Sequence, residues 1–122
     1  MLRSAQSPPI LTELGAEIGP VNRLRAYLEE HYDREISLEQ LAQIAELSSF
    51  HLNRSFSKTF GMPPHAYQIQ LRILQANRLL KRDWSIEKVA ITTGFVSQSH
   101  FGSHFKRLVC VAPRQYIQPT FR

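Results

Sequence analysis

Apolar residues recur every three or four positions through most of the chain, which is the spacing of an amphipathic helix. The clearest case is residues 49–60, where Leu52, Phe56 and Phe60 stand four apart and Gly61 follows as a helix-ending residue. No stretch of four to eight residues alternates between apolar and polar positions in the manner of a strand. The pattern therefore predicts an all-α fold.

The helical part is expected to begin after residues 1–19, whose prolines, glycines and serines predict a tail or linker with at most a short turn of helix around Ile10–Leu14. The first helix is then expected to run from Pro20 to about Tyr32. The longest predicted helix opens at Pro64, ends near Asp83 and has as its apolar positions Tyr67, Leu71, Leu74 and Leu79/Leu80. The other five are expected to begin at or beside Ser37, Ser48 or Ser49, Ser85, Ser97 and Pro113. The total is seven helices.

The two halves of the chain carry matching landmarks. At an offset of 48 residues, Ser37-Leu38-Glu39 matches Ser85-Ile86-Glu87, and Leu47 matches Phe95. The second copy then gains one residue, and the further pairs are His51 with His100, Leu52 with Phe101, Phe56 with Phe105, Pro64 with Pro113 and Tyr67 with Tyr116. Each copy has the pattern of a short helix, a tight turn and a second helix, which is typical of a helix-turn-helix. An ordinary bundle of matched helices is the alternative.

The predicted long helix between the copies has the length of a spacer. The 19 residues from Pro64 to Arg82 would span ~28 Å at 1.5 Å per residue, and adjacent major grooves on one face of DNA lie ~34 Å apart. The sequence therefore predicts four segments: 1–19 as a tail or linker, 20–62 as a first helix-turn-helix subdomain, 63–83 as a connecting helix and 84–122 as a second helix-turn-helix subdomain.

The net charge of +5 is unevenly distributed. Residues 1–47 hold four lysines or arginines against eight acidic residues, a net −4, whereas residues 48–122 hold 11 against two, a net +9. A basic block suits a polyanion such as nucleic acid, although a solvated basic face would carry the same charge. The chain has no apolar run long enough to cross a bilayer and no signal-peptide pattern, so a cytoplasmic protein that does not contact a membrane is expected.

Family motifs run through both halves of the chain. They are Ser85-Ile86-Glu87-Lys88-Val89-Ala90, Gly94-Phe95, Ser97-Gln98-Ser99-His100-Phe101, Phe105-Lys106-Arg107, Pro113-Arg114-Gln115-Tyr116, Leu41-Ala42, His51-Leu52-Asn53-Arg54-Ser55-Phe56, Gly61, Tyr67, Arg72, Ala76 and Leu79-Leu80. With them, roughly residues 20–118 resemble the DNA-binding domain of the AraC/XylS family of bacterial transcription regulators. The resemblance implies seven helices holding two helix-turn-helix units joined by a long helix. It also implies binding of double-stranded DNA and contact with RNA polymerase, with any effector ligand bound by an N-terminal domain absent from this chain.

Three positions depart from the family pattern. Cys110 stands where the family usually has glycine, Gly102-Ser103 replaces a stretch that often carries arginine, and Ile117 stands where arginine is common. The second recognition helix is therefore less basic than is typical of the family. We expect it to contribute less affinity, or to depend on the shape and deformability of the DNA.

The first recognition helix offers three candidate base contacts, to which the resemblance points. Arg54 has the donors to grip guanine O6 and N7, Asn53 could pair with adenine N6 and N7, and Phe50 could touch a thymine methyl group. The alternatives are a phosphate or surface role for Arg54 and core packing for Phe50. On the second helix, with Phe101, Phe105 and Leu108 expected to face the core, the base-reading candidates are Gln98 above all, with Ser99, Gly102 and Ser103.

A further set of residues is expected to meet the DNA backbone. Ser48 and Ser97 can cap their helices and also donate to phosphate, since helix N-termini favour anions. His51 and His100 occupy matching places in the repeat, which suggests a shared packing or backbone-contact role. The whole set is Ser48, Ser49, His51, Lys58, Ser97, His100, Lys106 and Arg107.

Catalysis and metal binding have weak support in the sequence. His100 and His104 stand four apart, as metal ligands on a helix can, but no good third ligand is near. The serines and histidines of residues 97–104 have no neighbouring carboxylate to orient a nucleophile, and DNA-repair methyltransferases that share such a module need cysteines beyond Cys110. We therefore predict no enzyme, no metal and no cofactor, with Cys110 as a small helix-end residue rather than a redox sensor. The remaining alternative is a helical protein-interaction module that does not read DNA.

Overall fold

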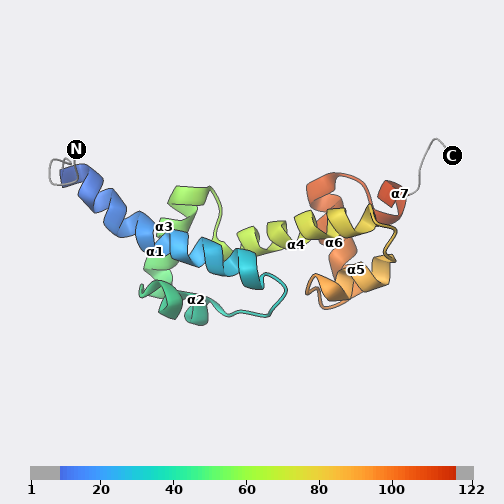
Figure 1. Ribbon diagram of the computed structural model, residues 1–122, viewed down its shortest axis with the longest axis horizontal. Coiled ribbons are helices and arrows are strands. Elements are labelled where there is room, and N and C mark those ends of the chain that lie inside the picture. Colours follow the sequence, from blue (N-terminus) through green and yellow to red (C-terminus); the bar gives the residue numbers. More distant parts are fainter. Residues whose placement is uncertain (1–8, 118–122) are drawn as a thin grey trace. The chain divides into compact units, whose positions relative to one another are not determined.

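The computed structural model describes the backbone of residues 9–117 and the side chains of residues 19–117. Over this range the chain forms seven helices and no strand, and Figure 1 shows their order along the chain. The helices are α1 (Pro9–His31), α2 (Leu38–Ala45), α3 (Ser49–Phe60), α4 (Pro64–Leu80), α5 (Ile86–Thr92), α6 (Gln98–Val109) and α7 (Pro113–Ile117). The predicted all-α fold with seven helices is confirmed.

The first helix is longer than the sequence pattern predicts. The expected start at Pro20 is wrong, because α1 begins at Pro9 and holds Pro20 in its interior. Proline has no N–H, so the bond that residue 20 would donate to the carbonyl of Ala16 is missing. Leucine, alanine and glutamate in residues 11–17 are strong helix formers, and they outweigh the two glycines that suggested a linker. Residues 1–8 of the expected tail lie outside the described range. None of the described helices, α1 included, could span a membrane.

The chain divides into two compact units, each containing one short helix paired with a longer one. The first unit comprises residues up to Glu30 together with Ile36–Pro64, and it pairs α2 with α3. The second unit comprises His31–Glu35 and residues from His65 onward, and it pairs α5 with α6 and α6 with α7. From His65 onward, α4 therefore belongs to the second unit.

The core of the first unit comes from one face of each of its helices. At the start of α2, Ser37 Oγ accepts from the N–H of Gln40, whose own side chain accepts from the N–H of Ser37. This reciprocal cap fixes where the helix begins. Phe60, at the end of α3, is half-buried, with its ring centroid 4.6 Å from that of Phe56. The buried apolar residues are Val21, Leu24, Leu28, Leu41, Ala42, Ala45, Leu52 and Phe56.

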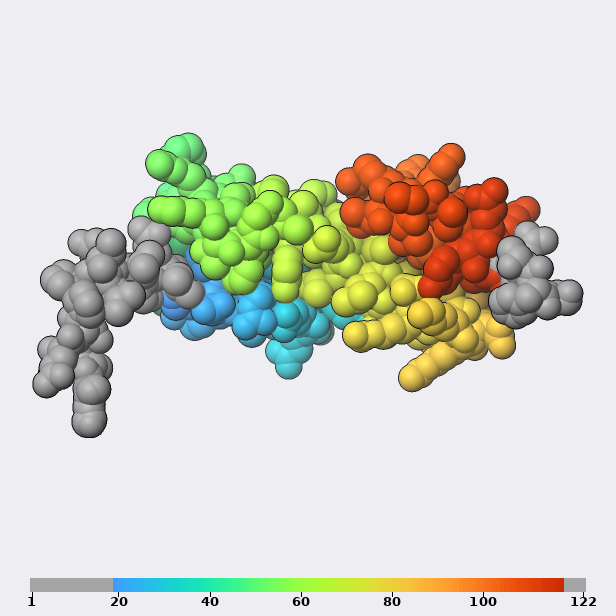
Figure 2. Space-filling model, turned by 90° about the horizontal axis from the view of Figure 1, so that it is seen from above, coloured from blue at the N-terminus to red at the C-terminus, as the bar shows by residue number. Residues whose placement is uncertain are grey.

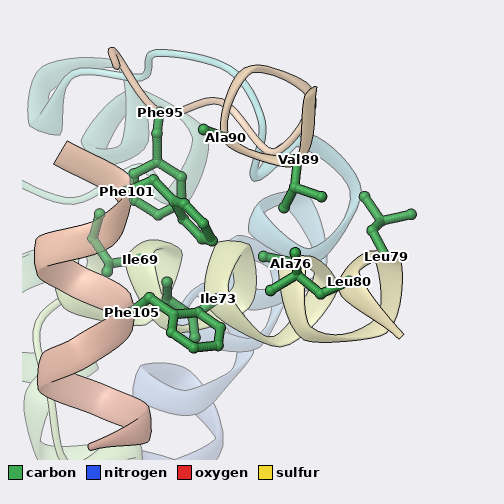
Figure 3. Close-up of a cluster of buried hydrophobic side chains, with 10 residues drawn as sticks. All are labelled: Ile69, Ile73, Ala76, Leu79, Leu80, Val89, Ala90, Phe95, Phe101 and Phe105. Atoms are coloured by element: carbon green, nitrogen blue, oxygen red, sulfur yellow. The ribbon is translucent and has the colours of Figure 1, made fainter. Parts of the chain in front are cut away.

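The core of the second unit is built around the aromatic side chains of α6. In the close-up of Figure 3, Phe101 and Phe105 extend from α6 toward α4, where Ile73 lies. Ring centroids follow one another at 5.3 Å from Phe95 to Phe101 and 5.4 Å from Phe101 to Phe105. The complete buried cluster is Ile69, Ile73, Ala76, Leu79, Leu80, Val89, Ala90, Phe95, Phe101 and Phe105. Phe101 and Phe105 thus pack α6 against α4.

The buried face of α4 differs from the predicted one. Leu79 and Leu80 are buried as expected, but Leu74 is 51% exposed, and Tyr67 and Leu71 are only half-buried. The core side chains are instead Ile69, Ile73 and Ala76, beside the buried polar residues Gln68 and Arg72. Because two polar residues share this face, the sequence pattern pointed to the wrong side. The helix also ends at Leu80 rather than Asp83, since turns close residues 81–83.

The two buried polar side chains of α4 hold residues 31–35 within the second unit. Gln68 Nε2 donates to the carbonyl of Tyr32 at 2.9 Å and to that of Arg34 at 2.7 Å. Arg72 donates to the same two carbonyls, from Nε at 2.7 Å and from Nη2 at 3.0 Å. Four hydrogen bonds therefore meet at two carbonyl oxygens, which explains why Gln68 and Arg72 are buried.

The same region brings Gly94 against the backbone of residue 33. A Cβ at Gly94, whose φ is +98°, would lie 2.6 Å from the carbonyl oxygen of Asp33. Arg72 lies over the ring of Phe95, with 5.5 Å from its Cζ to the ring centroid. Burial lowers the pKa of the Arg72 guanidinium, and the nearby carboxylates of Asp33 and Glu35 act in the opposite direction. Only glycine fits at position 94.

Candidate nucleic-acid interface

The two predicted recognition helices, α3 and α6, begin with the same cap. Ser48 Oγ accepts from the N–H of His51 at 3.1 Å, and Ser97 Oγ accepts from the N–H of His100 at 3.0 Å. The predicted capping serines are confirmed, with Ser48 rather than Ser49 as the cap of α3. The main-chain N–H groups of His51 and His100 thus have the same role, as donors to the capping serine. The other N–H groups of the first turn remain available to an anion.

The exposed face of α3 carries the three predicted base-reading side chains. Asn53 and Arg54 are exposed, and Phe50 is 76% exposed, which rules out core packing for its ring. Opposite them, Leu52 and Phe56 are fully buried. Of the residues predicted to contact the DNA backbone, Ser48, His51 and Lys58 are exposed and Ser49 is half-buried. One face of α3 is therefore available to a ligand along its length.

A hollow of about 330 Å³ lies on this side of α3. Its lining combines the cations of an arginine and a lysine with two hydroxyls, an imidazole and a phenyl ring. These groups can donate hydrogen bonds to an anion and pack against an apolar edge, which is the mixture that a DNA strand presents. The described lining residues are Ser48, Phe50, His51, Arg54, Ser55 and Lys58.

The exposed face of α6 carries most of its predicted set. Figure 2 shows the orange-red atoms of α6 on the surface of the second unit. Gly102 is half-buried, and it borders a small hollow between α6 and α7. The exposed members are Gln98, Ser99, His100, Ser103, Lys106 and Arg107, together with the capping Ser97.

Two residues at the end of α6 differ from expectation in their surroundings. Leu108, predicted to face the core, is 38% exposed. It lies at the edge of the apolar stripe in the last turn, and Val109 packs against the core in its place. Cys110 is the helix-end residue, as predicted, but its side chain is exposed and its φ is +77°. Its equivalent in the first unit is Gly61, with φ of +80°.

The histidines of α6 form part of a hydrogen-bonded row. His104 Nε2 lies 3.2 Å from His100 Nε2, and His104 Nδ1 lies 2.6 Å from Arg107 Nη2. Among the residues that the structure describes, no group of three or more histidine, cysteine or carboxylate side chains could hold a metal ion. The two imidazole rings instead contact each other, and His104 also contacts Arg107.

Val96 is a further exposed residue, just before α6, that the sequence analysis did not single out. Its side chain is 86% exposed, and it directly precedes Ser97, the cap of α6. The repeat could have pointed to this residue. Val96 is the extra residue of the second copy, and it lies between the matched pair Leu47/Phe95 and the matched pair His51/His100. An exposed apolar side chain beside a recognition helix is suited to a thymine methyl group.

Comparison with known proteins identifies the family. A family model described as a helix-turn-helix domain matches residues 41–118, which run from within α2 to beyond α7. The chain belongs to this family, in its AraC-type branch. The family consists of DNA-binding domains of transcription regulators and is not an enzyme family.

The relatives of this AraC-type domain include longer regulators. The chain is 34% identical over 99 residues to the HTH-type transcriptional activator RhaS of Enterobacter sp. (strain 638), with 80% of the chain covered. It is also 34% identical over 100 residues to the HTH-type transcriptional regulator YbfI of Bacillus subtilis (strain 168), with 82% covered. The match spans 36% of the length of each relative.

Solved structures of similar fold include one bound to DNA. The DNA-binding domain of AdpA, solved in complex with a target DNA, has a TM-score of 0.76 and 33% identity, covering 80% of this chain and 89% of that one. The C-terminal domain of AraT, a response regulator from Geobacillus stearothermophilus, has a TM-score of 0.76 and 27% identity, covering 81% and 84%. The architecture described above is therefore the shared architecture of these domains.

Proposed function

We propose that this AraC-type domain binds double-stranded DNA in a sequence-specific manner, with α3 and α6 lying in two successive major grooves. The observation that carries the proposal is the matched pair of exposed polar faces in one chain. Each face lies on a 12-residue helix capped by serine, opposite buried side chains that are Leu52 and Phe56 on α3 and Phe101 and Phe105 on α6. The net +9 of residues 48–122 supports it, because phosphate neutralisation supplies much of the affinity for DNA.

Base recognition is proposed to be divided unequally between the two helices. On α3, Arg54 would contact guanine, Asn53 adenine and Phe50 a thymine methyl, and their exposure supports these roles. On α6, Gln98 would be the main base contact, helped by the small residues Ser99, Gly102 and Ser103. Small side chains at these positions favour readout of DNA shape over hydrogen bonds to base edges.

Contacts to the DNA backbone would set the register of both helices. The exposed cations and the helix N-termini supply the donors, since phosphate oxygens accept from both. The proposed residues are Ser48, Ser49, His51 and Lys58 around α3, and Ser97, His100, Lys106 and Arg107 around α6.

Regulation is proposed to act through RNA polymerase, with activation as the outcome. RhaS is a transcriptional activator by name, and it shares 34% identity with this chain over 99 residues. Because the match spans 36% of that protein, a small-molecule effector is proposed to bind a separate domain of a longer regulator rather than the surfaces described here.

Selection of bound duplexes from a random DNA pool tests the proposal. The expected product is a site of ~20 base pairs with two preferred motifs about one helical turn apart. Its affinity should fall steeply with salt, with a slope of ~0.9 per phosphate contacted. Failure to enrich any sequence, or binding of a protein partner that is insensitive to salt, would instead favour an interaction module.

A further inference from the structure

Three side chains in a row on α6 are joined by hydrogen bonds, and the donor and acceptor in each bond follow from the chemistry of arginine and histidine. Arginine can only donate, so the contact of 2.6 Å between Arg107 Nη2 and His104 Nδ1 makes that nitrogen an acceptor. The proton of the neutral His104 ring is then on Nε2, where it donates to His100 Nε2 at 3.2 Å. His100 in turn carries its proton on Nδ1. The two hydrogen bonds of the row therefore run in one direction, from Arg107 to His104 and from His104 to His100.

The ring of His104 is held in place from the side of the core. It is half-buried and lies 5.9 Å, centroid to centroid, from the ring of Phe95, at an angle of 31°. Its ring also meets that of His100 edge-on at 4.6 Å. Because Phe95 is buried in the core cluster, the His104 ring has the core on one side and the exposed His100 and Arg107 on the other. Arg107, in contrast, is exposed.

The surroundings of His104 favour the neutral ring that this geometry requires. Burial lowers the pKa of His104 most, and the nearby His100, Arg107, His65 and Arg72 lower it further, since a cation at any of these positions disfavours a protonated His104 ring. A protonated ring would carry a hydrogen on Nδ1 and could no longer accept from Arg107. The neutral ring is thus the form that can hold the guanidinium.

The first unit has no counterpart of the contact between His104 and Arg107 at the matching positions. Ser55, the counterpart of His104, is buried and has no ring to present to Lys58, the counterpart of Arg107. Lys58 instead borders the hollow beside α3. Lysine is a flexible point charge, whereas the planar guanidinium of arginine gains most from being oriented before it meets phosphate.

We propose that His104 is a positioning residue, which holds the Arg107 guanidinium in one orientation for a DNA phosphate at the end of α6. The proposal rests on the DNA binding proposed above. Arginine has five N–H donors, and the bond to His104 uses one, which leaves a planar fork for the two oxygens of a phosphate. Immobilising the side chain before binding reduces the entropy lost on contact. The second helix, poor in cations at its base-reading positions, would thereby make one well-ordered backbone contact.

The test uses a duplex selected by the full chain and four variants. His104→Asn keeps an acceptor near the place of Nδ1, and His104→Leu fills similar space without one. Arg107→Ala removes the guanidinium, and Lys106→Ala is the neighbouring charge control. For each, the slope of log affinity against log salt is measured, and methylphosphonate linkages that neutralise single phosphates are scanned along the duplex. Thermal unfolding confirms that each variant is folded, and His104→Ala replaces His104→Leu if leucine disturbs the core.

Arg107→Ala should lower the slope by ~0.9, the value of one phosphate contact. His104→Leu should give the same loss, His104→Asn should retain the wild-type slope, and Arg107→Ala with His104→Leu should lose no more than either alone. Both single variants should become insensitive to neutralisation of the same phosphate, while Lys106→Ala keeps that sensitivity. A wild-type slope in His104→Leu or in Arg107→Ala would overturn this inference and leave DNA binding intact. If the chain selects no duplex at all, the proposed function fails with it.

Discussion

The two helix-turn-helix units use glycine at opposite ends of the same motif. Each unit has one left-handed residue in the turn and one at the end of its recognition helix. In the first unit these are Glu46 and Gly61, with φ of 59° and 80°. In the second they are Gly94 and Cys110, with φ of 98° and 77°. The backbone needs the conformation at all four places, but the surroundings decide where a side chain is tolerated.

The difference lies in what surrounds each glycine. A Cβ at Gly61 would meet nothing within 4 Å, whereas one at Gly94 would lie 2.6 Å from the Asp33 carbonyl oxygen. The segment with Asp33 is itself held by Gln68 and Arg72, so it cannot easily withdraw. At position 61 glycine is favoured only by the left-handed backbone conformation. At position 94 it is required both by that conformation and by the close approach of the Asp33 backbone.

The largest expected effect comes from adding one methyl group to each glycine. Gly94→Ala should lower the free energy of unfolding by ~2–4 kcal/mol, because left-handed strain adds to overpacking against backbone. Gly61→Ala, the matched control, should lose only ~1 kcal/mol from strain. Urea unfolding of both variants measures the difference. Equal losses would mean that the Asp33 contact has no energetic weight.

The next effect separates the two recognition faces. Arg54 and Ser103 occupy matching positions of α3 and α6, and both are exposed. Arg54→Ala should cost ~1–3 kcal/mol of discrimination between the selected site and a single-base variant, since a bidentate base contact is lost. Ser103→Ala should cost much less. Competition binding on the two duplexes checks this, and a larger loss at Ser103 would reverse the proposed division of specificity.

A smaller effect, of opposite sign, is expected from relieving strain. Cys110→Gly should stabilise the second unit by ~0.5–1 kcal/mol, because the gain from removing Cβ at φ of 77° exceeds the added entropy of the unfolded chain. Cys110→Ala keeps the Cβ and should leave stability nearly unchanged. The midpoint of urea unfolding reports both, and stabilisation by alanine would point to the sulfur rather than the backbone.

The smallest effect concerns pH and only one of the units. His104 has a pKa below the ordinary ~6.5, so the unfolded chain binds its proton first as pH falls. The contribution of His104 to stability should therefore be fully present above about pH 6.5 and decline as pH falls from there toward the lower folded pKa. His104→Asn should show a flatter dependence in thermal unfolding between pH 7.5 and 5.5. An identical dependence would assign the titration to other groups.

Local chemistry made much of the fold predictable. Serine caps, helix-ending glycine and four-residue apolar spacing act within one or two turns, so they can be read without tertiary structure. For that reason the starts of α2, α3, α5 and α6 and the buried phenylalanines of both recognition helices were predicted correctly. Ser48 and Ser97, each predicted as a cap from its place at a helix start, are the caps of α3 and α6.

What was missed depends on partners far away in the sequence. Arg72 can be buried because it donates hydrogen bonds to the carbonyls of Arg34 and Tyr32. These acceptors lie 38 and 40 residues earlier in the chain, so no local sequence pattern predicts them. The α4 face containing Arg72 consequently looked polar, and Leu74 was assigned to the core. The sequence analysis weighed His104 only as one of a histidine pair and predicted no metal there, and only the contact with Arg107 reveals what its Nδ1 does. The roles proposed for individual residues in DNA binding stay predictions.

Hydroxyl-radical footprinting of the chain on its selected duplex tests the central claim most directly. If α3 and α6 of one chain occupy successive major grooves, two protected patches should appear on the same face of the DNA, ~10 base pairs apart. Arg54→Ala should weaken one patch and Gln98→Ala the other. A single protected patch that both variants affect alike would contradict the account.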